Sequence, residues 1–143
     1  MSAQATGDAA VADVLKRIPY AAYLGVRADQ RGDELTLVLP FSERLIGNIA
    51  LPALHGGVVG AFLELTAIAQ LSVSGKLARL PKTIDISIDY LRSGRPVESY
   101  ARARIVKVGR RIANVQVEAW QAERGNPIAA LHGHFLMPNG TDA

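Results

Sequence analysis

The sequence contains no cysteine among its 143 residues. Disulfide bonds, cysteine-ligated zinc and a thiolate nucleophile are therefore excluded. It also lacks internal repeats and low-complexity tracts. No apolar segment follows a basic N-terminus, so we expect no signal peptide and a cytoplasmic location. The length suits one domain with a sizeable core and is too short for two. We therefore expect a single domain over residues 1–143, with disordered ends at 1–7 and 138–143.

Acidic residues are scarce in one part of the chain. Seven basic residues and a single acid, Glu98, lie between Arg92 and Arg111, although the whole chain carries only +3. A local basic cluster on a nearly neutral protein favours a small anionic ligand over a long polyanion. Solvated strand faces would explain any single arginine equally well. Nucleic-acid binding is not expected, because the chain has neither a recognised motif nor an aromatic stacking array.

The spacing of apolar residues predicts an α+β fold. It predicts an amphipathic helix over Asp8–Ile18, with Asp8 as its N-cap, and then a short turn or one-turn helix over Tyr20–Leu24, closed by Gly25. Alternation predicts a first pair of strands joined at Arg31–Asp33, and then four more strands in an antiparallel meander. The predicted strands are Val26–Gln30, Glu34–Pro40, Thr83–Leu91, Val97–Val108, Ile112–Gln121 and Ile128–Met137. The stretch Phe41–Leu54 has no period, which indicates a loop.

The stretch Asn48–Leu77 organises the chain, because its second half predicts a helix that is apolar nearly all the way round. Such a helix is buried. We do not expect a membrane span, since Glu64 and Gln70 interrupt the apolar run and the other elements are amphipathic. A curved antiparallel sheet wrapped around this helix explains its composition. A second copy, placed edge to edge, would bury more of it, so we expect a homodimer or a dimer of dimers.

Residues His55-Gly56-Gly57 lead directly into this helix. Glycines at a helix N-terminus leave the first amides bare, and the helix dipole is positive there, so such a terminus can hold a developing oxyanion. Glu64 follows Gly57 and Gly60 on the same helix face. A carboxylate in a buried helix is costly unless it is paired or used, and it suits a general base or a nucleophile. A structural Glu64, hydrogen-bonded across a dimer interface, is the alternative. A structural role for His55 is at least as well supported as a catalytic one.

These motifs occur in an order that resembles a known family. Leu45-Ile46-Gly47-Asn48, His55-Gly56-Gly57 and Glu64 are similar to the active-site segment of hotdog-fold acyl-CoA thioesterases of the PaaI type. Thr83–Arg92 is similar to the family's strand after the helix, and Val106–Arg111 to its next hairpin. The resemblance covers the chain from Gly25 to Phe135. One departure is Glu64, where many members have aspartate.

The resemblance implies a thioester hydrolase that works at a dimer interface on acyl-CoA. The Gly57 amide would polarise the thioester carbonyl, and Glu64 from the other subunit would activate water or attack directly. Asn48 would position water or the thioester, His55 would orient the loop, and Thr83 would place a hydroxyl near the carboxylate. The remaining expected contacts are with CoA and its phosphates. They come from Gly56, Arg92, Gly109, Arg110 and Arg111.

Other functions fit parts of the same sequence. Glu64–Gln70 also resembles the central helix of hotdog dehydratases or hydratases, but the loop before it lacks their His-Phe-Pro-Gly segment. An acyl-CoA-binding protein without catalytic activity is a further alternative, which an assay for released thiol would separate from the enzyme. His132 and His134 share a strand face, but no third ligand lies nearby in sequence, so we expect no metal and no cofactor.

Overall fold

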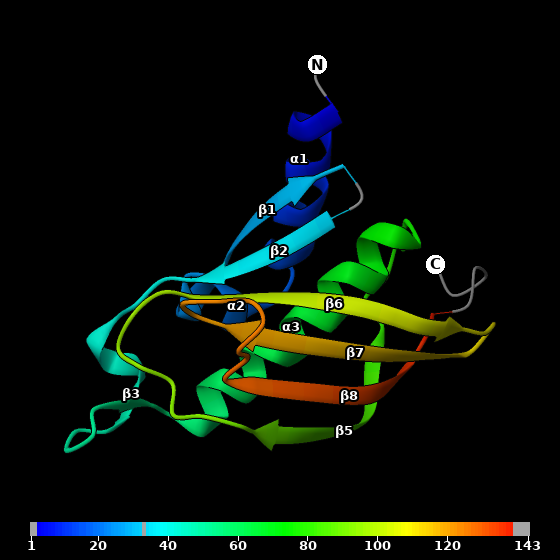
Figure 1. Ribbon diagram of the computed structural model, residues 1–143. Coiled ribbons are helices and arrows are strands. Elements are labelled where there is room, and N and C mark those ends of the chain that lie inside the picture. The colour runs from blue at the N-terminus through cyan, green and yellow to red at the C-terminus, as the bar shows by residue number, and fades with distance from the viewer. Residues whose placement is uncertain (1–2, 33, 139–143) are drawn as a thin grey trace.

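The computed structural model describes residues 3–32 and 34–138. One six-stranded antiparallel sheet curves around a single long helix, and a shorter helix covers one end of the sheet (Figure 1). The helices are α1 (Ala3–Lys16), α2 (Pro19–Leu24) and α3 (Gly56–Ser74), and a 3₁₀ turn spans Glu43–Leu45. The strands are β1 (Arg27–Arg31), β2 (Glu34–Leu39), β3 (Ile46–Asn48), β4 (Ala53–Leu54), β5 (Lys82–Tyr90), β6 (Ser99–Val108), β7 (Ile112–Trp120) and β8 (Ala129–Leu136). The predicted α+β class and hotdog fold are confirmed.

The strand order is β1-β2-β6-β7-β8-β5, which corrects part of the predicted topology. Strands β6, β7 and β8 do form a meander, but β5 pairs with β8 and lies at the edge. The segment 91–98 is therefore a crossing connection rather than a hairpin turn. It is held by a hydrogen bond from the Leu54 amide to the Gly94 carbonyl, 2.9 Å long, which ties it to the start of α3. Alternation within a strand does not encode which strand is its neighbour.

Helix α3 supplies one layer of the core and the inner face of the sheet supplies the other. Phe62, Leu63 and Ala67 are 1% exposed or less, and they face inward residues of β7 and β8 such as Val115 and Phe135. Alternate residues of β7 and β8 point toward the helix, as the burial of every second residue shows. The core thus buries most of α3 and leaves the helix side nearest β5 partly open.

Helix α3 has the length and hydropathy of a membrane span, and among the described residues no other helix does. Of its most apolar window, 61% is buried inside the protein. The core of the fold accounts for its apolar composition.

The N-terminal region is more helical than predicted. Helix α1 begins at Ala3 rather than at Asp8, so the prediction of Asp8 as its N-cap is wrong. Apolar contacts made by Val11, Val14 and Leu15 bury one side of this helix, which stabilises more than its first turn. Residues 1–2 and 139–143 lie outside the described part of the chain. Helix α2 ends as predicted at Gly25, whose φ of 74° favours glycine.

The stretch Phe41–Leu54 is not a plain loop. Strands β3 and β4 pair across it and form a small second sheet. The His55 amide donates to the Leu45 carbonyl at 2.9 Å and extends this pairing to the first residue before α3. The short strands lack an alternating pattern and are therefore not predicted from the sequence, yet they fix the direction in which α3 begins.

Candidate active site

His55 is the N-cap of α3, and its ring accepts a hydrogen bond from the Gly57 amide at 2.9 Å. The expectation of a bare Gly57 amide is therefore wrong for this chain, because the residue two positions earlier satisfies it. Since Nδ1 is the acceptor, a neutral His55 ring carries its proton on Nε2. His55, Gly56 and Gly57 are all exposed, so a ligand can reach the turn and compete for this amide.

Gly47 explains how closely the β3 segment approaches His55. A Cβ built on Gly47 would lie 2.7 Å from His55 Cα and 2.9 Å from His55 Cβ. Real side chains do not tolerate such contacts with backbone atoms. Gly47 thus allows strand β3 to press against the N-cap and hold it in place.

We predict that Gly47→Ala lowers the free energy of unfolding by about 1–3 kcal/mol, because the added methyl overlaps the His55 backbone. Gly125→Ala is the matched control, since nothing lies within 4 Å of its built Cβ, and its change should stay within about 0.5 kcal/mol. Urea unfolding of the three proteins measures both values. Equal stability of the two variants would show that the contact is not a constraint.

Glu64 lies on the open side of α3, where it is half-buried rather than fully buried as predicted. Its Oε2 accepts a hydrogen bond from Thr83 Oγ1 at 2.7 Å. Thr83 is the second residue of β5 and is exposed. The structure therefore brings together Glu64 and the threonine expected beside it, at the edge of the sheet.

The other end of β5 contacts the beginning of α3. Tyr90 Oη donates to the Gly56 carbonyl oxygen at 2.8 Å, and a Cβ on Gly60 would lie 2.9 Å from Ile88 Cδ1. Gly60 thus lets the helix approach the strand closely. Sequence reasoning did not assign Tyr90 a role in the site, although its inward position on the alternating strand is a usable signal.

Asn48 ends strand β3 and shapes the loop that follows it. Its Oδ1 accepts hydrogen bonds from the amides of Ala50 at 3.0 Å and Leu51 at 3.3 Å. This is an Asx turn. The oxygen is thereby occupied, whereas no contact to the side-chain NH₂ group is found among the described residues. Asn48 is exposed and can present that group as a donor.

The predicted basic cluster does not form one patch. Arg92 follows the C-terminal end of β5 and donates to the Pro127 carbonyl at 2.7 Å. Gly109, Arg110 and Arg111 lie in the β6–β7 turn, at the end of the sheet where β5 begins, with β8 between β7 and β5. Eight residue steps separate the two ends of β5, a length of about 26 Å.

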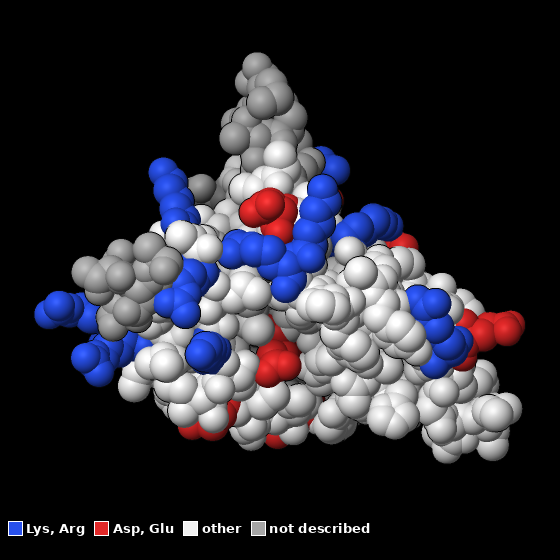
Figure 2. Space-filling view, turned by 180° about the vertical axis from the view of Figure 1, so that it is seen from behind, with Lys and Arg blue, Asp and Glu red and all other residues white. Residues whose placement is uncertain are grey.

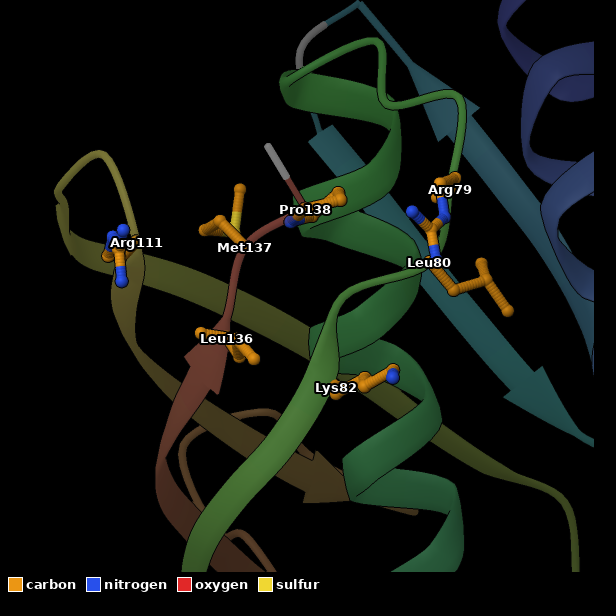
Figure 3. A pocket seen from close by; sticks show the side chains of 7 residues that line it. All are labelled: Arg79, Leu80, Lys82, Arg111, Leu136, Met137 and Pro138. Carbon is orange, nitrogen blue, oxygen red and sulfur yellow. The ribbon is translucent and has the colours of Figure 1, made fainter. Parts of the chain in front are cut away.

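A different group of cations gathers at the N-terminal end of β5. Arg111 lines a cavity of about 190 Å³ together with Arg79 and Lys82, two residues that sequence reasoning did not assign to the site (Figure 3). The floor and the remaining walls are apolar, from Leu80, Leu136, Met137 and Pro138. The signal that was missed is the run of basic residues on both sides of Leu80-Pro81, before the strand that carries Thr83.

The outer face of the sheet carries polar side chains that pair with one another. His134 Nδ1 lies 2.8 Å from Asp85 Oδ1, and no group of three possible metal ligands was found among the residues that the structure describes. On β6, the Tyr100 hydroxyl donates to Glu98 at 2.8 Å. This hydrogen bond, together with burial and the charge of the carboxylate, raises the pKa of Tyr100. These contacts occupy the convex side, away from Glu64.

Comparison with known proteins now identifies the class. The family model of the Thioesterase superfamily matches residues 51–128, which include the His55–Gly57 turn, Glu64 and Thr83. The medium/long-chain acyl-CoA thioesterase YigI of Escherichia coli K12 is 27% identical over 122 residues, covering 75% of this chain and 78% of its own length.

Solved structures show the same fold. A protein of Chromobacterium violaceum is 37% identical, with a TM-score of 0.73 over 92% of this chain and 91% of its own. A Shewanella oneidensis protein, described as related to the thioesterase superfamily, is 28% identical with a TM-score of 0.76 over 94% and 97%. The chain belongs to the thioesterase superfamily, and the prediction of a thioester hydrolase is confirmed at this level.

Proposed function

We propose that this protein is an acyl-CoA thioesterase of the PaaI type. It hydrolyses the thioester at a site shared by two copies of the chain. One observation carries the proposal: the two halves of the expected site contact opposite ends of the same edge strand. Glu64 contacts Thr83 near the start of β5, and Gly56 contacts Tyr90 at its end.

Within one chain these halves are too far apart to act on the same carbonyl. Gly57 and Glu64 are seven residues apart on α3, which corresponds to a rise of about 10 Å. An oxyanion donor must lie about 3 Å from the oxygen it stabilises. Antiparallel pairing of β5 with the β5 of a second copy reverses its ends, so the Thr83 end of one strand lies beside the Tyr90 end of the other. Each dimer then holds two complete sites.

The exposed side chains support β5 as the dimer edge. All of its residues except Ile88 are exposed, and Ile84 and Tyr90 are 50% and 56% accessible. Apolar side chains on a long free edge favour pairing with another chain. The opposite edge, β1, is short and reads Arg-Ala-Asp-Gln-Arg, a composition that discourages pairing. The proposed dimer therefore uses the one edge that also carries the candidate catalytic residues.

The proposed reaction assigns a role to each residue at the site. The thioester carbonyl displaces His55 Nδ1 as the acceptor of the Gly57 amide, and His55 then orients the turn. Glu64 either takes a proton from water, whose oxygen attacks the carbonyl carbon, or attacks it directly and forms an anhydride that water then cleaves. The carbon–sulfur bond breaks in both cases, and the thiol leaves with a proton. Thr83 orients the carboxylate, and Asn48 donates to water or to the thioester.

The substrate class follows from the relatives and from the basic residues. Similarity to YigI favours medium- and long-chain acyl groups. We propose that Gly56, Gly109, Arg110 and Arg111 contact the CoA portion. Antiparallel pairing also returns Arg92 of the second copy to the same end of the site. The cytoplasm, where acyl-CoA is available, is the proposed location.

A panel of acyl-CoAs, with release of free thiol as the readout, tests this function. We expect turnover of medium- and long-chain acyl-CoAs to exceed that of aryl-CoAs. Tight binding of acyl-CoA without thiol release would instead establish a binding protein. Conversion of a 3-hydroxyacyl or enoyl thioester, with the thioester intact, would establish a dehydratase or hydratase.

A further inference from the structure

Tyr90 and His55 hold the two ends of one peptide bond at the beginning of α3. The bond joins Gly56 to Gly57, so the Gly56 carbonyl and the Gly57 amide belong to the same rigid plane. Tyr90 Oη donates to the carbonyl oxygen at 2.8 Å, and the amide donates to His55 Nδ1 at 2.9 Å. The direction in which the amide points is therefore fixed from both sides of the plane.

Gly60 gives the tyrosine hydroxyl room to reach this peptide. A Cβ built on Gly60 would lie 3.3 Å from Tyr90 Oη, which is closer than most real side chains accept. The first carbonyl of a helix accepts from the amide four residues later, and its second lone pair is free for a further donor. The small residue one turn into α3 thus lets a side chain of β5 occupy the second lone pair of Gly56.

The hydrogen bond from Tyr90 acts on the far end of the peptide as well. Donation to a carbonyl oxygen draws electron density from the nitrogen, so the amide of the same peptide becomes a stronger donor. The helix dipole acts in the same direction at this terminus. In the view from behind, basic side chains are few along the lower edge of the molecule, the level at which Figure 1 draws the beginning of α3 (Figure 2). Negative charge that develops there depends mainly on backbone dipoles for its stabilisation.

Resting on the proposed function, we infer that Tyr90 is a positioning residue for the oxyanion donor. Its hydroxyl orients and polarises the Gly56–Gly57 peptide, and it acts through that peptide rather than by touching the substrate. Thr83, near the other end of β5, orients Glu64 in the same way. One edge strand therefore aligns both halves of the proposed site, and its antiparallel pairing with a second copy brings the two aligned groups to one thioester.

Tyr90→Phe tests the inference, because it removes the hydroxyl and keeps the ring. Loss of a whole oxyanion donor lowers kcat about 10²–10³-fold, and a coupled hydrogen bond strengthens its neighbour by about 10–30%. We therefore expect kcat for acyl-CoA to fall about two- to eightfold, with KM unchanged. Tyr100→Phe is the matched control, since the Tyr100 hydroxyl donates to Glu98 on the outer face of the sheet, and it should leave both constants at their wild-type values.

Nuclear magnetic resonance observes the peptide directly and requires no turnover. Gly56-Gly57 is the one Gly-Gly pair among the 13 glycines of the sequence. Glycine labelled with ¹³C at the carbonyl and with ¹⁵N therefore gives a single carbonyl–amide correlation, which belongs to this peptide. In Tyr90→Phe we expect the carbonyl carbon and the amide proton to move to lower frequency, because both hydrogen bonds weaken, whereas Tyr100→Phe should leave the signal in place. An unmoved signal in Tyr90→Phe would overturn the inference whatever the rates.

Fluorinated tyrosines at position 90 separate polarisation of the peptide from a purely structural contact. One or two fluorines on the ring make the phenol a stronger donor and keep its hydrogen bond. At a pH where the phenol stays protonated, kcat should rise as fluorine is added, because the amide becomes a stronger donor in step. A structural contact would leave kcat independent of the acidity of the phenol, and that result would overturn the inference.

The activity of the wild type separates this inference from the proposed function. If the wild type releases no thiol from any acyl-CoA, the proposed function fails, and the catalytic contribution of Tyr90 fails with it. If the wild type is active and Tyr90→Phe keeps its full kcat, the inference alone fails. A higher KM for Tyr90→Phe at unchanged kcat would also reject it, since the hydroxyl would then bind the substrate itself.

Discussion

Replacing Glu64 by glutamine is expected to lower kcat at least about a hundredfold, in line with the loss of a general base or nucleophile. Glutamine keeps the length of the side chain and an oxygen that accepts the Thr83 hydrogen bond, so the substitution removes the charge and leaves the contact in place. Thermal unfolding should be nearly unchanged, because Glu64 is only half-buried. Steady-state thiol release from a saturating acyl-CoA measures the effect.

Two further variants make this result specific. Glu118→Ala removes an exposed carboxylate on the outer face of the sheet and should leave kcat as it is. Thr83→Val removes the hydroxyl that orients the carboxylate, and we expect an intermediate loss of about tenfold, since Glu64 itself remains. Undiminished turnover in Glu64→Gln would discard the mechanism while leaving the fold and family untouched.

The sequence predicted the elements of this fold far better than their arrangement. Alternation located β5, β6, β7 and β8, because the two faces of a strand differ in their surroundings. The continuous apolar run located α3, because a helix that is buried on most sides is apolar on most sides. The pairing of β5 with β8 leaves no such trace, and the meander was wrong for that reason. The start of α1 was missed because burial of its middle turns, rather than a capping residue, sets its length.

The sequence predicted which residues form the candidate site, but it did not predict all of the contacts between them. His55, Gly57, Glu64 and Thr83 were all identified in sequence, and the structure pairs Glu64 with Thr83. The contact between His55 and the Gly57 amide depends on a ring orientation that residue order does not specify. The cavity beside Lys82 is lined by residues 79–82, 111 and 136–138, three segments that are distant in sequence and that only folding brings together.

Preventing the two copies from pairing along β5 is expected to abolish activity, because each site would lose one of its halves. Ile84→Lys places a charge at a half-exposed position of the β5 edge, where it should prevent pairing and give a folded monomer with kcat reduced about as much as in Glu64→Gln. Val106→Lys, at 43% exposure on β6, is the matched control and should keep the assembly. Light scattering coupled to gel filtration gives the mass of each.

A sharper form of this prediction uses two inactive chains. Gly57→Pro removes the proposed oxyanion donor at a first-turn position where proline is tolerated, and Glu64→Gln removes the carboxylate. When the two variants are co-expressed, random pairing gives mixed dimers in half of the cases, each with one intact site, so activity should return to about a quarter of the wild-type value. A chain with both substitutions, co-expressed with wild type, gives mixed dimers with no intact site. If the two single variants fail to restore activity together, each chain must contain its own complete site, and the shared arrangement along β5 is wrong.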